Sequence, residues 1–277
     1  MKKSKTIHFL LFIALIHYSC TGITAHEFWI EPKKFIVESN EKISGNLFVG
    51  QIMKGVSYGY YPKNFKQFEI KTNNGIKSLI GRIGDKPAIN IPAQGDSLVT
   101  IIHATTDSMV SYNDWTTFDK FLTEKNFTSI RSKHLQSNFP KKQFKEIYSR
   151  YAKALVGSGT SEGSDQKTGL EVELVLKENP YTQDLTNGLT IELFYKGLPR
   201  ADTQIEIFSR DSHKIVTRNV VFTNELGQAV IQVKRQTDYM INSVVMRQPI
   251  HDKTNIADSN QPILWESLWA SISFKVP

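Results

Sequence analysis

The chain has 277 residues and a single cysteine, Cys20, which lies near the amino terminus. Once that region is removed, the protein has no disulfide bond and no thiolate ligand. Packing alone then stabilises it, and a bound metal has to be held by nitrogen, oxygen or methionine sulfur. The net charge of +7 falls to +4 without the three lysines of the first 25 residues, a balance that gives no indication of nucleic-acid binding.

Motifs for several enzyme classes are also missing. Residues 157–169 are small and polar, and we expect an exposed loop there, but the Gly-Lys-Ser/Thr ending of a phosphate loop is absent. No glycine fingerprint follows a strand, no serine stands in a nucleophile motif, and no pair of catalytic carboxylates can be singled out. Hydrolases and nucleotide-dependent enzymes are therefore disfavoured, and we expect a non-catalytic protein.

An export signal occupies residues 1–25. Three lysines among the first five residues precede an apolar run at residues 7–16, and small or neutral residues lead to Ala25. The run is too short to span a bilayer. We therefore predict cleavage between Ala25 and His26, a periplasmic or secreted protein, and no transmembrane segment in the mature chain.

Acylation of Cys20 is the alternative processing route, in which the protein becomes a lipoprotein. A leucine usually stands three residues before such a cysteine, and this chain has His17 there. We therefore favour cleavage at Ala25. The choice matters because only that cleavage makes His26 the first residue.

An amino-terminal His26 carries a free α-amine and an imidazole on the same residue. The amine and Nδ1 can close a six-membered chelate ring around one transition metal, and both donors suit nickel, cobalt, copper or zinc. We predict His103 and His134 as the further metal ligands. The spacings His-x-His and His-Glu-x-x-His are absent, so the fold would have to bring these residues together.

Each of the two further histidines also has a structural alternative. His103 shares a strand face with Val99 and Ile101, where a hydrogen-bonded core histidine is the commoner role. His134 lies between two predicted helices, where it could interact with a helix end. His213 and His251 stand in polar turns or loops, where we expect solvated side chains.

Short runs of alternating apolar and polar residues, separated by turn residues, predict a mainly β protein. We predict two antiparallel β-sandwiches, an N-terminal one over residues 26–112 and a C-terminal one of immunoglobulin-like size over residues 181–277. A linker loop and connecting strand fill residues 157–180. Glu27 and Glu31 are expected on an exposed strand edge, and residues 268–276 on a half-buried closing strand.

A helical insertion is predicted over residues 113–156. Its first helix follows Asn113 or Asp114 as a cap, and Trp115, Phe118 and Phe121 recur there at helical spacing. A second helix is predicted after Pro140 from one apolar stripe flanked by basic residues. The stripe consists of Phe144, Ile147, Tyr148, Tyr151 and Leu155.

Four segments carry a resemblance to a known family. They are His26-Glu27-Phe28-Trp29-Ile30-Glu31-Pro32, Arg150-Tyr151-Ala152-Lys153-Ala154-Leu155, Glu178-Asn179-Pro180-Tyr181 and Trp265-Glu266-Ser267-Leu268-Trp269-Ala270-Ser271. Together they resemble an exported domain-of-unknown-function family that is associated with nickel and cobalt uptake. The resemblance implies an exported β-rich protein, an immunoglobulin-like or transthyretin-like C-terminal module, and a role in metal handling.

These observations favour an exported, non-catalytic accessory protein that binds or delivers nickel, cobalt or copper, with a membrane metal transporter as its partner. Two alternatives stay open. One is a copper oxidative enzyme that uses an amino-terminal histidine brace, as lytic polysaccharide monooxygenases do. The other is a metal-free adhesion or scaffold module.

Overall fold

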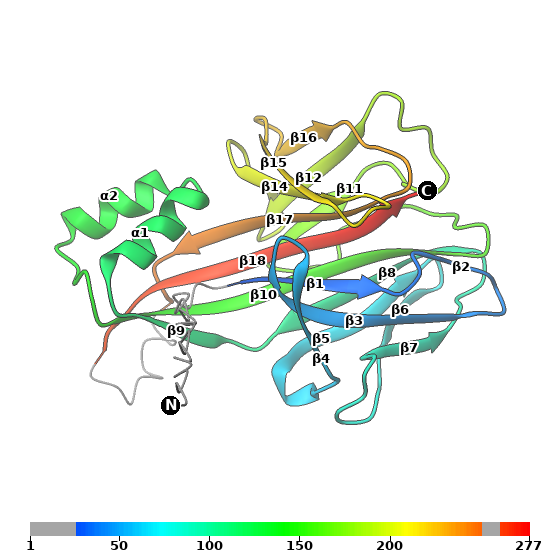
Figure 1. The fold of residues 1–277 in the computed structure, drawn as a ribbon, viewed down its shortest axis with the longest axis horizontal. Coiled ribbons are helices and arrows are strands. Elements are labelled where there is room, and N and C mark those ends of the chain that lie inside the picture. Colours follow the sequence, from blue (N-terminus) through cyan, green and yellow to red (C-terminus); the bar gives the residue numbers. More distant parts are fainter. Residues whose placement is uncertain (1–25, 251–260) are drawn as a thin grey trace, which may run out of the picture.

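The computed structural model describes residues 26–250 and 261–277, and in this part the protein is mainly β (Figure 1). The predicted export signal, Cys20 and His251 lie outside the described residues. Three sheets and two short α-helices make up the described chain. No helix in the described ranges has the length and apolar content needed to span a membrane.

A ten-stranded sheet runs through the middle of the molecule (Figure 1). Its main path, from one edge to the other, is β15 (Val216–Phe222), β14 (Gln204–Arg210), β17 (Thr237–Arg247), β18 (Ile263–Val276), β10 (Phe144–Ser158), β8 (Ser97–Thr105), β5 (Phe65–Thr72) and β6 (Gly75–Ser78). The short strands β2 (Ile36–Val37) and β9 (Ser108–Tyr112) also pair with β10. This sheet joins strands from both predicted domains, so the boundaries at residues 112 and 181 stay a prediction.

A four-stranded sheet lies on each side of the central sheet. The first contains β1 (Glu27–Pro32), β3 (Lys42–Gln51), β4 (Lys54–Tyr58) and β7 (Ile89–Pro92), and the 3-10 turn Pro62–Asn64 follows β4. The second contains β11 (Val172–Leu176), β12 (Leu189–Tyr195), β13 (Leu198–Pro199) and β16 (Gln228–Ile231). Each sheet buries one apolar face against the central sheet, which supplies the hydrophobic driving force for the layered arrangement.

The long strands of the central sheet are therefore buried on both faces. Along β18, Leu268, Ala270 and Ile272 pack toward the second small sheet, while Trp265 and Trp269 pack under the helices. The prediction of a half-buried closing strand was wrong for this reason. The prediction of purely antiparallel pairing was wrong at the centre of the sheet, because β10 and β18 pair in parallel.

The first predicted helix is confirmed as α1 (Trp115–Glu124). Asp114 is its cap, and its Oδ1 accepts a hydrogen bond of 2.8 Å from the Thr117 N–H. The apolar side of α1 packs Phe118 and Phe121 onto Trp265 and Trp269. The second helix is α2 (Thr128–Gln136), which comes earlier in the chain than predicted.

The segment after Pro140 is the central strand β10 and not a helix. Its basic residues resembled the polar face of a helix, but Arg150 is partly buried and Lys153 is fully buried. Lys153 is 1% exposed, and its Nζ lies 2.7 Å from the Asp165 carboxylate and 3.3 Å from that of Glu173. Asp165 belongs to the loop predicted as exposed, so this part of the loop is buried because it neutralises Lys153.

Strand β1 is fixed to the central sheet through its backbone. Every second residue of an edge strand directs its carbonyl away from its partner strand. The Phe28 carbonyl accepts a bond of 2.7 Å from Ser271 Oγ, and the Ile30 carbonyl accepts one from Ser273 Oγ. The His26 carbonyl accepts a bond of 3.3 Å from Arg150 Nε. Polar residues of β10 and β18 thus satisfy the edge that a neighbouring strand would otherwise cover.

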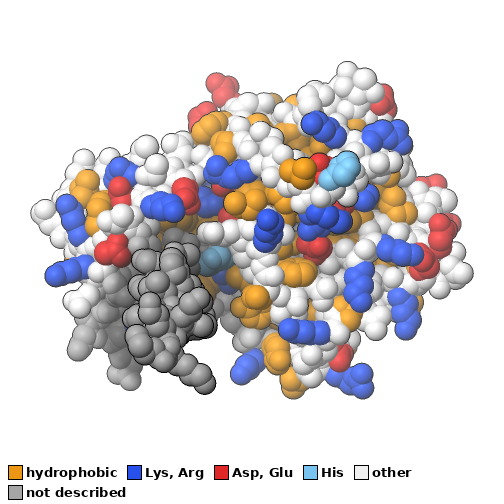
Figure 2. Space-filling view, viewed as in Figure 1, with side chains coloured by type: hydrophobic (Ala, Val, Ile, Leu, Met, Phe, Trp, Pro, Cys, Tyr) orange, Lys and Arg blue, Asp and Glu red, His pale blue; other side chains and the backbone are white. Residues whose placement is uncertain are grey.

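The surface carries no single-sign stripe on the face shown in Figure 2. Lysine and arginine side chains are scattered over this face, with acidic side chains among them. Such a distribution matches the modest net charge.

Removing the two serine hydroxyls should loosen β1. We expect the double variant Ser271→Ala, Ser273→Ala to lose roughly 1–3 kcal/mol of unfolding free energy per orphaned carbonyl, measured by urea denaturation. Hydrogen exchange should also become faster in β1 than in β12. Ser212→Ala, in an exposed turn, is the matched control and should stay within about 0.5 kcal/mol. A double variant as stable as this control would contradict the role given to the serines.

Candidate functional site

A pocket of about 290 Å³ opens between the first small sheet and the central sheet. Phe28 comes from β1, Phe65 from β5, His103 from β8 and Arg150 from β10, while Tyr58 and Tyr61 follow from β4 and its loop. The walls combine aromatic side chains with polar and charged ones, among them His103, Asp107 and Arg150. This is the usual composition of a site for a small ligand.

His103 is the most unusual group in the pocket. It is 1% exposed, and its ring lies among Phe28, Phe65 and Phe68, with ring centroids 5.0, 4.6 and 5.0 Å away. Neither ring nitrogen has a hydrogen-bond partner in the described protein. Buried polar atoms are normally paired, so two orphaned nitrogens at the wall of a pocket point to a group that the chain itself does not supply.

Burial lowers the pKa of His103 to about 3, because an imidazolium ion would be desolvated among aromatic rings. The ring is therefore neutral at physiological pH. A neutral imidazole has one nitrogen lone pair available for a metal ion or a hydrogen-bond donor.

Arg150 supplies the positive charge of the pocket. Its guanidinium lies 4.5 Å from the centroid of the Tyr148 ring, and Nε is bonded to the His26 carbonyl. Burial lowers the pKa of this arginine. Asp107 also lines the pocket, and its carboxylate lies 2.6 Å from Lys66 Nζ.

The predicted ligands behave differently from one another. His26 does not line the pocket, but its carbonyl is bonded to Arg150, which does, and Phe28, two residues later, contacts His103. His134 is not brought to them. Its Nδ1 accepts a bond of 2.9 Å from Trp265 Nε1, and its Nε2 lies 3.2 Å from the Pro140 carbonyl. Both nitrogens are engaged, so His134 serves the helix packing and is unsuited to metal binding.

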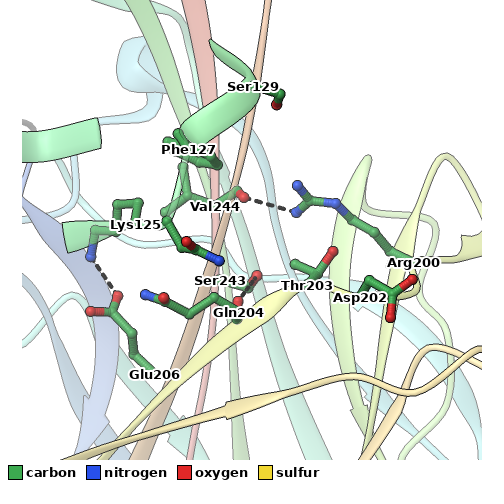
Figure 3. A pocket seen from close by; sticks show the side chains of 11 residues that line it. Lys125, Phe127, Ser129, Arg200, Asp202, Thr203, Gln204, Glu206, Ser243 and Val244 are labelled. Carbon is green, nitrogen blue, oxygen red and sulfur yellow. Dashed lines mark hydrogen bonds and ion pairs between the residues drawn. The ribbon is translucent and has the colours of Figure 1, made fainter. Parts of the chain in front are cut away.

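A second pocket, of about 170 Å³, lies where the end of α1 meets β14 and β17 (Figure 3). Lys125 Nζ pairs with Glu206 and lies 3.5 Å from Glu27 Oε1, while Arg218 Nη2 lies 2.7 Å from Glu206. Arg200 Nη1 donates to the Val244 carbonyl at 2.8 Å. Lys125, Glu206 and Arg218 form ion pairs and Arg200 is bonded to a backbone carbonyl, so we regard the second pocket as a structural junction and the His103 pocket as the stronger candidate.

The ion pairs also correct the expectation for two carboxylates. Glu27 is 7% exposed and pairs with Lys125, and burial is the main reason that its pKa is raised. Glu31 pairs with Arg210 at 2.9 Å. Neither residue lies on an exposed strand edge, because side chains of the central sheet cover this side of β1.

Among residues 26–250 and 261–277, no three histidine, cysteine, aspartate or glutamate side chains form a group that could hold a metal. Of the residues that line the pocket, the sequence analysis singled out His103 as a candidate ligand. No spacing motif connects His103 with Phe28, so their contact could not be predicted. Arg150 was missed, because the sequence placed it on the polar side of a helix.

Replacing His103 by phenylalanine should stabilise the ligand-free protein. The variant keeps the aromatic packing and removes two unpaired nitrogens, so we expect roughly 1–2 kcal/mol of added stability at pH 7.5. The advantage should grow as pH falls. The pKa of His103 in the folded protein, about 3, lies below the usual histidine pKa of 6.5, so only the unfolded wild-type chain takes up the proton between these values.

The stability advantage of His103→Phe should increase by about 2 kcal/mol between pH 7.5 and pH 5. Each pH unit below the unfolded-state pKa adds about 1.4 kcal/mol. Urea denaturation of both chains at each pH measures it. Glu146 titrates in the opposite sense, since burial raises its pKa to about 7, but it does so in both chains and cancels. A stability difference that is constant with pH would contradict the buried neutral state of His103.

The chain was compared with known proteins. No curated protein and no solved structure matches it. Residues 23–247 match the family described as Domain of unknown function (DUF4198), which confirms the predicted kinship with a family of unknown function. The association with nickel and cobalt uptake stays a prediction. Because the match spans most of the sequence, the chain belongs to the DUF4198 family.

Proposed function

We propose that the protein is an exported, non-catalytic binding protein that captures a divalent transition metal for transfer to a membrane transporter. The observation that carries this proposal is the buried His103 with two unpaired ring nitrogens at the wall of a pocket, with the His26 carbonyl bonded to Arg150 of the same wall. In this proposal, the His26 amine and imidazole and the His103 imidazole bind nickel, cobalt or copper.

The strand geometry supports a shared site for His26 and His103. Side chains alternate along an extended chain, and Glu27 faces Lys125 on the opposite side from Phe28. His26 is therefore expected on the same side as Phe28, about 7 Å further along the chain. A metal with bonds of about 2 Å to each imidazole can connect two histidines over such a separation.

The donor set also suits a cargo protein. Three nitrogen ligands leave coordination positions open, through which a metal can be passed to another ligand. Copper should bind more tightly than nickel or cobalt in a simple titration, whichever metal is the natural cargo. We also propose that the C-terminal part forms an immunoglobulin-like or transthyretin-like module.

The amino terminus provides a sharp test. We expect a chain that begins at His26 to bind one Ni²⁺ or Cu²⁺ in calorimetric titration, and the same chain extended by Ala25 to bind at least about tenfold more weakly, because the extension removes the chelating amine. His103→Phe should weaken binding in the chain that begins at His26. His213→Ala, in an exposed turn, is the control and should bind like wild type.

Equal affinity of the extended and unextended chains would contradict the chelate. Oxygen consumption by the copper-loaded protein with a reductant would favour the oxidative enzyme instead. Absence of binding for nickel, cobalt and copper would favour the metal-free scaffold.

A further inference from the structure

Arg150 is a partly buried cation that the metal proposal does not use. The described chain places no carboxylate within ion-pair distance of its guanidinium, and Asp107, the acidic residue of the same pocket wall, is paired with Lys66. The contacts of Arg150 are the His26 carbonyl and the Tyr148 ring. A guanidinium in such surroundings favours a carboxylate or another oxyanion as its ligand.

A bare divalent cation fits this pocket poorly. It would carry two positive charges toward Arg150, which forms no ion pair with a carboxylate of the described chain and which Glu146 stabilises only at longer range. An anionic partner that enters with the metal removes this conflict. His103 and Arg150 then have separate roles, since one offers a lone pair and the other offers charge and N–H donors.

The size of the pocket limits the partner. A volume of about 290 Å³ corresponds to roughly ten water molecules, at about 30 Å³ for each. This is enough for one metal ion with a small organic acid, and too little for a folded protein segment.

Resting on the proposed metal-binding function, we propose that the natural cargo is a transition metal already held by a small multi-carboxylate chelator. One carboxylate of the chelator binds the Arg150 guanidinium, and the metal binds His103 and His26. The pocket thus recognises the complex and not the aqueous ion.

Calorimetric titration with Ni²⁺ alone and with a one-to-one nickel citrate complex tests this inference, on the chain that begins at His26 and at equal free nickel concentration. We expect the complex to bind at least about tenfold more tightly than nickel alone. Arg150→Gln should remove this preference and raise the affinity for nickel alone, because glutamine lacks the charge that repels the bare ion but keeps an N–H donor for the His26 carbonyl. Arg150→Lys keeps the charge and should retain part of the preference.

Ser271→Ala is the matched control, since it also removes a donor to a β1 carbonyl but does not line the pocket. It should keep the full preference for the complex. Equal affinity for nickel and nickel citrate would overturn the inference and leave the proposed function standing. A loss of both affinities in Arg150→Gln would also overturn it, because Arg150 would then act only by holding β1. Absence of binding in either titration would overturn the proposed function as well.

Discussion

The attachment of strand β1 to the central sheet is the interaction on which the rest of the account depends. The carbonyls of His26, Phe28 and Ile30 accept bonds from Arg150, Ser271 and Ser273. These contacts fix the first residues of the described chain against its last strand. They also place His26 beside the only pocket among those discussed whose wall contains unpaired buried nitrogens. The segment that begins at His26 is thereby held at a defined position.

Two groups of polar residues flank β1, and they differ in how completely they are satisfied. On one side, Lys125 pairs with Glu27 and Glu206 and ties α1 to β14, although Glu27 Oε2 has no hydrogen-bond partner in the described protein. On the other side, the His103 ring nitrogens have no hydrogen-bond partner, and Arg150 forms no ion pair with a described carboxylate, since Glu146 acts on it only at longer range. Natural proteins tolerate unsatisfied buried groups mainly where function requires them. This contrast separates the structural side of the strand from the side that we regard as functional.

The sequence predicted the mainly β character, many strand positions and the capped helix α1, because alternation and capping are local signals. It failed at β10. Lys153 is charged but buried, and Arg150 is charged but partly buried. Lys153 pairs with Asp165, and Arg150 donates to the His26 carbonyl. No sequence motif links either residue to its partner. A strand buried on both faces has no alternation to detect. Of the predicted ligands, His103 lines the candidate pocket and the His26 backbone is bonded to Arg150 of its wall, while His134 is used in helix packing.

The central claim is that His26 and His103 bind the same metal ion. Electron paramagnetic resonance of the Cu²⁺-loaded chain that begins at His26 tests it most directly, because coupling to the remote imidazole nitrogens counts the bound histidine rings. The account predicts two equatorial imidazoles in the wild type and one in His103→Phe. Identical spectra from the two chains would contradict it.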